Sequence, residues 1–148
     1  MMKLYLDMCC YNRPYDPQEQ MRIHLETQAK LHIQKLIKSG EYELVSSYTL
    51  DYELSNVPLE ERKQAIAQFI RENASEYIGA ENRTAVEQKA ETIMATGIKE
   101  KDAMHLASAI LSKCDCFIST DKRLLKYQTS EILMCNPVDL VIRMEGAE

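Results

Sequence analysis

The sequence predicts an α/β fold in which helices cover both faces of a central parallel sheet. Short runs rich in Leu, Val, Ile and Phe recur along the chain, and segments with helical spacing of apolar residues separate them. Strands and helices that alternate in this way form parallel sheets, because each helix packs back on the sheet. A length of 148 residues suits one domain, so we expect residues 1–148 to form a single three-layer α/β/α unit.

The first predicted elements are a strand at residues 3–7, which ends in an acid, and a long helix at residues 18–38. Between them Pro14 and Pro17 mark a loop. Gly40 follows the basic last turn of the helix, as expected just past a helix C-terminus.

The next predicted elements lead away from a second strand at residues 42–46. Ser47 is suited to cap a short helix that carries Glu53, and another helix follows Pro58. The remaining elements are a strand at residues 76–78, a helix at 82–96, a helix that begins near Asp102, and strands at 114–119 and 131–135.

Composition and charge exclude several classes of protein. Hydrophobic residues make up 45% of the chain and charged residues 28%, as in ordinary soluble globular proteins. No run approaches the roughly 20 apolar residues that cross a bilayer, and Asp7 comes too early for a signal peptide. A formal net charge of −5 argues against broad, non-specific wrapping of nucleic acid.

The five cysteines pose a choice between a zinc site and free thiols. Zinc ligands usually occur as two pairs spaced by two to four residues, and neither Cys9-Cys10 nor Cys114-Asp115-Cys116 fits that spacing. An odd number of cysteines in apolar surroundings favours buried free thiols and a reducing compartment, so we expect a cytoplasmic protein.

Four acids occupy positions where a parallel sheet would bring them together. Asp7 ends the first strand, Asp121 follows the strand at 114–119, Glu53 lies in the helix after the second strand, and Asp102 begins a helix. Ligands of open parallel sheets bind beyond the carboxyl ends of the strands. Four carboxylates at one edge repel one another, and a hard cation such as Mg²⁺ or Mn²⁺ relieves that repulsion.

Each acid also has a structural explanation. For Glu53 or Asp102 taken singly, a charge near a helix N-terminus is the better explanation, because acids are common there. Asp7 is harder to explain in that way, since an acid at the end of an apolar strand has no obvious structural partner.

Four segments resemble the motifs of the PIN-domain family, in the right order and spacing. They are residues 4–10 (LYLDMCC), 47–53 (SYTLDYE), 101–109 (KDAMHLASA) and 118–125 (ISTDKRLL). The resemblance implies a PIN-like three-layer fold. It also implies that Asp7, Glu53, Asp102 and Asp121 act as metal-binding and catalytic residues in Mg²⁺- or Mn²⁺-dependent cleavage of RNA.

The family resemblance also bears on partners. Many members are toxins paired with antitoxins, so the resemblance makes an antitoxin partner possible, and a homodimer is possible as well. A second function stays open as well: a catalytically silent PIN-fold module that binds RNA or a protein partner. Haloacid-dehalogenase-like phosphatases need a second Asp where Cys9 stands, and response-regulator receivers need paired acids that this chain lacks.

Several individual assignments remain open at this level. Asp51 competes with Glu53 for the second motif, and the resemblance favours Glu53. His105 lies one helical turn after Asp102, where a structural hydrogen bond is favoured over substrate contact. Arg13 fits a phosphate ligand and a plain surface charge equally well. Asn12, Arg13, Thr120 and Arg123 are the candidate substrate-binding residues.

Overall fold

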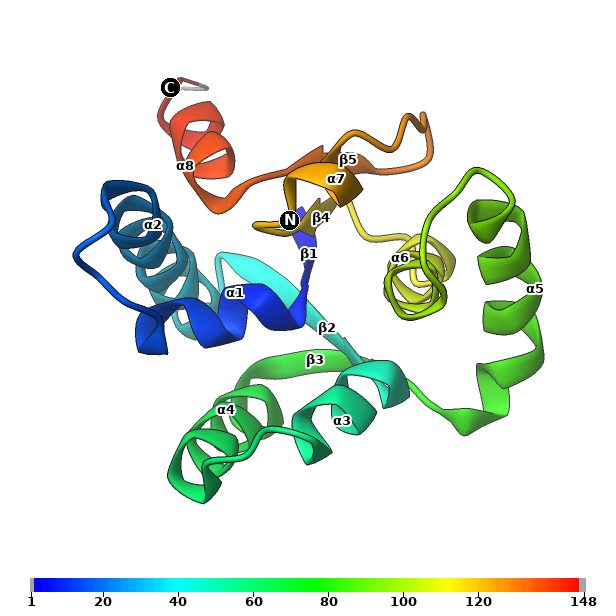
Figure 1. Cartoon of the computed structure of the whole chain (residues 1–148), viewed down its shortest axis with the longest axis horizontal. Helices are drawn as coiled ribbons and strands as arrows, with labels where there is room; N and C mark the ends of the chain where they lie inside the picture. The colour runs from blue at the N-terminus through cyan, green and yellow to red at the C-terminus, as the bar shows by residue number, and fades with distance from the viewer. Residues whose placement is uncertain (1, 147–148) are drawn as a thin grey trace.

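A five-stranded parallel sheet forms the centre of the computed structural model, which describes residues 2–146 (Figure 1). Its strand order is β3-β2-β1-β4-β5, and each neighbouring pair is parallel. The strands are β1 (Met2–Leu6), β2 (Tyr42–Ser47), β3 (Ala74–Ile78), β4 (Cys116–Ile118) and β5 (Leu133–Cys135). The predicted parallel sheet is therefore confirmed.

Helices lie on both faces of this sheet, which completes the predicted three layers. In Figure 1, α2 and α8 lie on one side of the sheet, while α5 and α6 lie on the other. Among residues 2–146, no helix combines the length and the apolar character that a membrane span requires. The helices are α1 (Met8–Asn12), α2 (Met21–Lys38), α3 (Tyr48–Ser55), α4 (Glu60–Asn73), α5 (Arg83–Met94), α6 (Glu100–Leu111), α7 (Lys122–Leu125) and α8 (Pro137–Gly146).

The direction in which strands are added reverses at β1. The chain first adds β2 and β3 on one side of β1, and later places β4 and β5 on the other side. Open α/β sheets bind ligands in the crevice beyond the strand ends at such a reversal. The topology therefore points to the ends of β1 and β4.

The central strands are buried on both faces, which explains their nearly continuous apolar sequence. Leu4, Leu6, Leu44, Phe117 and Ile118 are all fully buried. Burying a large apolar side chain contributes about 1.5–3 kcal/mol relative to exposure, so these strands anchor the sheet that positions the site.

Several element boundaries differ from the sequence prediction by one to three residues, and two of them have a local explanation. The helix expected from residue 18 begins at Met21, because the amide Nε2 of Gln18 donates to the carbonyl oxygens of Arg13 and Asp16, each at 2.9 Å, and forms a turn instead. The strand expected at 114–119 is limited to Cys116–Ile118, and the preceding Lys113 has a left-handed φ of 61°.

Three helices were not predicted from the sequence. α1 and α7 are 5 and 4 residues long, which is too short to show a helical repeat of apolar residues. α8 begins after Asn136, whose side-chain Oδ1 accepts a hydrogen bond from the backbone N–H of Val138 at 2.8 Å. It packs against α2, so tertiary contact rather than a long periodic pattern accounts for it.

Candidate active site at the carboxyl edge of the sheet

Asp7 lies at the strand-order reversal and is almost fully buried, with 6% of its surface exposed. Its backbone N–H donates to the Ile118 carbonyl at 2.9 Å, which fixes the end of β1 to β4. One carboxylate oxygen caps α1 by accepting from Met8 N at 2.9 Å, and the other accepts from Ser119 Oγ at 2.9 Å. These bonds satisfy part of a charge that burial would otherwise destabilise.

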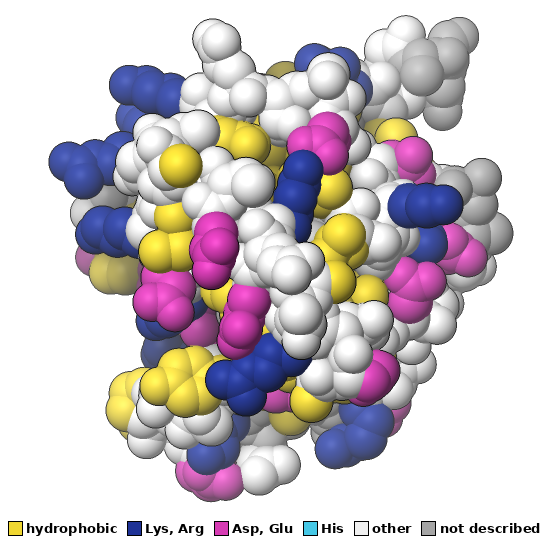
Figure 2. Space-filling model, turned by 90° about the vertical axis from the view of Figure 1, so that its right-hand side faces the viewer, with side chains coloured by type: hydrophobic (Ala, Val, Ile, Leu, Met, Phe, Trp, Pro, Cys, Tyr) yellow, Lys and Arg dark blue, Asp and Glu magenta, His cyan; other side chains and the backbone are white. Residues whose placement is uncertain are grey.

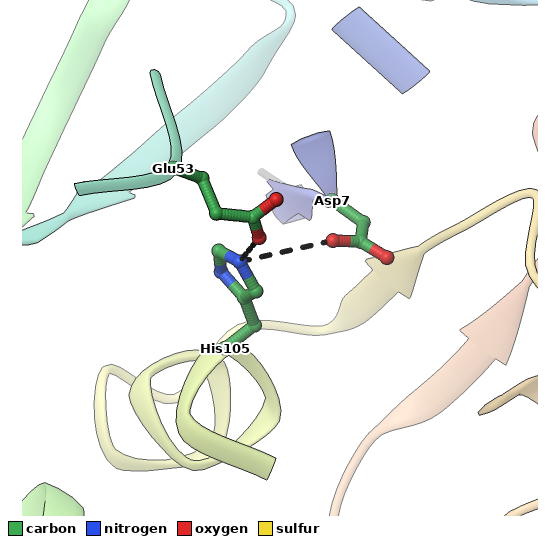
Figure 3. A group of neighbouring side chains, drawn as sticks. All are labelled: Asp7, Glu53 and His105. Carbon is green, nitrogen blue, oxygen red and sulfur yellow. Dashed lines mark hydrogen bonds and ion pairs between the residues drawn. The ribbon is translucent and has the colours of Figure 1, made fainter. Parts of the chain in front are cut away.

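Glu53 reaches the same place from α3. That helix begins at Ser47, whose Oγ accepts from the Leu50 N–H at 3.2 Å and so serves as the predicted N-cap. One turn further along α3, the Glu53 carboxylate is hydrogen-bonded to Nε2 of His105, which projects from α6 (Figure 3). The same nitrogen lies 3.9 Å from Asp7 Oδ1.

These three side chains form a compact group that could hold a metal ion. Ligand atoms of Asp7, Glu53 and His105 all lie within 4.8 Å of one another, although they come from three separate elements (Figure 3). The competing acid, Asp51, is exposed, and its carboxylate accepts from the Tyr77 hydroxyl at 2.6 Å. The structure thus places Glu53, rather than Asp51, beside Asp7.

A buried hydrogen-bond chain holds His105 from behind. Its Nδ1 lies 2.6 Å from the Tyr5 hydroxyl, which in turn lies 2.6 Å from Ser47 Oγ. Burial is the main cause that raises the pKa of Tyr5, so the phenol keeps its proton. If Ser47 donates to Tyr5 and Tyr5 donates to Nδ1, a neutral His105 can donate from Nε2 to Glu53. This chain fixes the histidine ring and supports a structural role for His105.

Asp102, in the first turn of α6, is not among the three side chains within 4.8 Å of one another, but it lies in their electrostatic field. Partial burial is the largest cause that raises the pKa of Asp102, followed by the negative charges of Asp7 and Asp121. Glu53 acts in the same direction, whereas His105 opposes it. Asp102 therefore lies within the field of the other three predicted acids.

Asp121 follows β4 and begins α7. Its Oδ1 accepts from the N–H groups of Arg123 at 2.9 Å and Leu124 at 3.3 Å, which is an N-cap arrangement. Ser119 Oγ accepts from the Asp121 N–H at 3.1 Å and donates to Asp7 Oδ2 at 2.9 Å. One hydroxyl therefore connects the Asp7 carboxylate to the backbone N–H of Asp121.

The candidate substrate-binding residues have different surroundings. Asn12 lines a cavity together with Glu53, and Arg123 is exposed on α7. Thr120 is buried, and its carbonyl accepts from Arg22 at 2.6 Å. Of these four residues only Arg123 is exposed, while Asn12 is partly buried at the cavity beside Glu53.

Arg13 is neither a plain surface charge nor a free phosphate ligand. Its guanidinium pairs with Glu26 at 2.6 Å and with Asp16 at 3.0 Å, and only 15% of its side chain is exposed. Glu26 is itself 98% buried and also pairs with Arg22. The guanidinium N–H groups that would bind a phosphate already donate to Asp16 and Glu26, so the geometry favours a structural role for Arg13.

Three residues at the site were not assigned to it from the sequence. Tyr5 stands between two leucines in β1 and Ser119 directly follows β4, where a polar group facing the site could have been suspected. Cys9 is only partly buried, and its Sγ lies 3.5 Å from Asp7 Oδ2 and 3.4 Å from Ser119 Oγ. The expectation of buried thiols fits the other four cysteines, which are free and buried.

The fold and the site together define a class: α/β/α proteins with a group of carboxylates, suited to a metal ion, where the strand order of a parallel sheet reverses. Residues 21–129 match the family described as PIN domain. This chain belongs to the PIN-domain family. No match to a curated protein was found.

Solved structures show the same fold at low sequence identity. VapBC2 from Rickettsia felis, bound to a DNA fragment from its promoter, is 14% identical with a TM-score of 0.59 and covers 91% of this chain and 98% of that one. FitAcB from Neisseria gonorrhoeae is 14% identical with a TM-score of 0.55, covering 90% and 97%. FitAB bound to an IR36 DNA fragment is 15% identical with a TM-score of 0.54, covering 91% and 95%.

Proposed function

We propose that this protein is a metal-dependent endoribonuclease that cleaves single-stranded RNA. The observation that carries the proposal is the gathering of acids from distant elements: Asp7 and Glu53 lie in one group with His105, and Asp102 lies in their field. Acids crowd together at a cost in repulsion, and a cation removes that cost. Membership of the PIN-domain family supports the same function.

The residues present fit a hard divalent cation. Carboxylate oxygens are the ligands that Mg²⁺ and Mn²⁺ prefer, and Asp7, Glu53, Asp102 and Asp121 supply them. When bound, such a cation activates a water molecule for attack on a phosphodiester and neutralises charge on the phosphate. The negative charges that raise the pKa of Asp102 are independent support for a cation here.

The neighbouring side chains orient the acids for this task. His105, held by Tyr5, fixes the Glu53 carboxylate, while Ser119 fixes Asp7. Because hydrogen-bonded neighbours that orient metal ligands usually contribute to affinity and activity, these three residues are positioning residues.

A cleavage assay with a matched pair of variants tests the proposal. Wild-type protein should cleave single-stranded RNA with Mg²⁺ or Mn²⁺ and lose activity with EDTA. Asp7→Asn should abolish cleavage, because it removes a central negative ligand, whereas Asp139→Asn on the exposed start of α8 should leave it unchanged. Undiminished cleavage by Asp7→Asn would exclude the proposed site. RNA binding without cleavage would favour the silent binding module.

A protein partner is proposed from the family and its solved relatives. The similar structures include VapBC2 and FitAB assemblies on DNA, and many members of the PIN-domain family are toxins paired with antitoxins. We expect the adjoining reading frame to encode a small DNA-binding antitoxin, whose addition should suppress cleavage. A homodimer is the second expected assembly, to be measured by light scattering.

The proposal also covers the domain boundaries and the cellular compartment of the protein. We propose that residues 1–148 form one PIN-like domain. Both β1 and α8 lie outside the matched residues 21–129, yet β1 is the central strand of the sheet and α8 packs against α2. Five free cysteines support a reducing cytoplasm, since thiols persist there.

A further inference from the structure

A polar cavity of about 240 Å³ lies directly beside Glu53. It is lined from several elements by Met8, Asn12, Glu53, Asn56, Arg62 and Lys101. Cavities that enclose drug-sized ligands have volumes of about 300–1,000 Å³, so this one suits a smaller group such as one nucleobase with its phosphate. Its position next to a proposed metal ligand would place that group beside the scissile bond.

Two polar atoms at this cavity lack partners within the described chain. Asn12 Oδ1 and Arg62 Nε are shielded from solvent, yet neither forms a hydrogen bond with any residue in 2–146. Buried polar atoms in proteins are ordinarily satisfied, and leaving them unsatisfied costs free energy. A ligand with its own donors and acceptors would supply the missing partners.

The two cations at the cavity are also uncommitted. Arg13, Arg22 and Arg83 are each paired with a carboxylate, whereas Arg62 and Lys101 form no ion pair among the described residues. Arg62 is oriented instead by the ring of Tyr15, with its guanidinium carbon 4.8 Å from the ring centroid. An aromatic contact holds the guanidinium in place without neutralising its charge, which leaves that charge available to an anion.

A shallow groove meets this cavity at Lys101. The groove is lined by Tyr48, Tyr52, Arg83, Lys101 and Met104, together with the acids Asp51 and Glu100, and Tyr52 is 66% exposed. Exposed aromatic rings beside cations are typical of surfaces that bind single-stranded nucleic acid, because bases stack on the rings and phosphates contact the cations. Lys101 belongs to both hollows, so one strand could follow the groove and enter the cavity.

The geometry points to the cavity as a nucleotide subsite of a single-stranded RNA substrate. Asn12 and Asn56 contact the base, Arg62 and Lys101 contact its phosphate, and Tyr52 supports the neighbouring base. Amide side chains offer both a donor and an acceptor and can distinguish base edges, whereas phosphate contacts carry no base information. This inference rests on the proposed ribonuclease function and names the residues that would set its base preference.

Binding of four six-nucleotide homopolymers of A, C, G and U tests the subsite. Fluorescence anisotropy in EDTA at low salt measures binding without cleavage. Wild-type protein should prefer one base by about five-fold or more. Asn12→Ala and Asn56→Ala should remove most of this preference. Arg62→Gln should weaken binding of all four by about five- to ten-fold and keep the preference.

Matched controls separate these effects from changes in folding. Arg71→Gln alters the same residue type on the same helix, α4, away from the cavity. Asn73→Ala matches Asn56→Ala, because each amide donates to the carbonyl four residues earlier at a helix end. Both controls should bind like wild type, and thermal unfolding should show that all variants fold.

The outcomes distinguish the subsite from the function on which it rests. Equal binding by Arg62→Gln and Arg71→Gln, or an unchanged base preference in both Asn12→Ala and Asn56→Ala, overturns the subsite. If wild-type protein still cleaves the same RNAs with Mn²⁺, the ribonuclease proposal survives that result. Absence of both binding and cleavage of every RNA overturns both.

Discussion

At the scale of single residues, the hydroxyl of Tyr5 explains how a histidine with no exposed surface keeps both ring nitrogens hydrogen-bonded. Tyr5 and Tyr11 are both buried, but only Tyr5 has hydroxyl partners among the described residues. Tyr5→Phe leaves the Ser47 hydroxyl and His105 Nδ1 without their shared partner. We expect a loss of about 1–3 kcal/mol in the free energy of unfolding.

Tyr11→Phe is the matched control for that change, measured by urea unfolding. It removes a buried hydroxyl that lacks a partner in residues 2–146, so stability should be unchanged or slightly higher. Equal losses in the two variants would mean that the Tyr5 hydrogen bonds contribute nothing specific.

The residue scale also predicts a pH dependence for the metal-free protein. Burial and neighbouring acids raise the pKa of Asp102 above its ordinary 3.8 in the folded state. The folded state therefore binds the Asp102 proton more tightly than the unfolded state does. As the pH rises from about 3.8 through the raised pKa of the folded state, ionisation of Asp102 progressively lowers the free energy of unfolding. Asp102→Asn should unfold at higher urea than wild type at pH 7 in EDTA, and the difference should shrink toward pH 4.

Two additions make this measurement decisive. Asp139→Asn removes an exposed acid and should not raise stability at either pH. Saturating Mg²⁺ or Mn²⁺ should stabilise wild type more than Asp102→Asn, because a cation relieves repulsion that the variant lacks. A variant no more stable than wild type in EDTA would contradict the crowding of acids around Asp102.

At the scale of elements, α3 depends on one capping residue that also serves the site. Ser47 is fully buried, caps α3 through Leu50 N and contacts the Tyr5 hydroxyl. Ser47→Ala should cost about 1–2 kcal/mol in unfolding free energy, because it removes the cap and a buried hydrogen bond. Cleavage should fall as well, since α3 carries Glu53.

Ser55→Ala, at the other end of α3, is the control for this prediction. Ser55 is exposed and its Oγ only donates to the Tyr52 carbonyl within the helix. Its replacement should change stability by no more than about 0.5 kcal/mol. Chemical denaturation and cleavage rates, measured on both serine variants, check the expected contrast.

At the scale of the whole molecule, an acidic protein must hold a polyanion through a small basic area. The net charge is −5, and on the face that carries α5 Figure 2 shows Lys and Arg side chains interspersed with Asp and Glu. Five exposed cations lie close in sequence to the predicted acids: Lys99, Lys101, Lys122, Arg123 and Lys126. Attraction should therefore be local.

Salt dependence of RNA binding measures this area. Each phosphate neutralised on a single strand contributes about −0.7 to the slope of log affinity against log salt, so two or three contacts give roughly −1.5 to −2. Arg123→Gln should reduce affinity for all sequences alike. A slope several times steeper would reveal a larger basic surface, such as one completed by a second subunit. Independence from salt would favour a protein-binding function.

The sequence by itself determined the fold class and predicted the four acids. Apolar runs that alternate with helical segments indicate a parallel sheet. Asp7 and Asp121 each follow a buried strand, so they lie at the carboxyl edge of that sheet, because parallel strands end at the same edge. The N-cap at Ser47 was equally local, since a capping hydroxyl acts within three residues of its own position.

Only the tertiary structure decided which groups meet. Arg13 lies 13 residues from Glu26, and Ser119 lies 112 residues from Asp7, so neither the buried ion pair nor the shared hydroxyl has a sequence spacing that reveals it. The same holds for Tyr5 and His105, which are 100 residues apart. Hydrogen bonds and ion pairs act over a few ångströms in space, and chain folding alone sets which side chains come within that range.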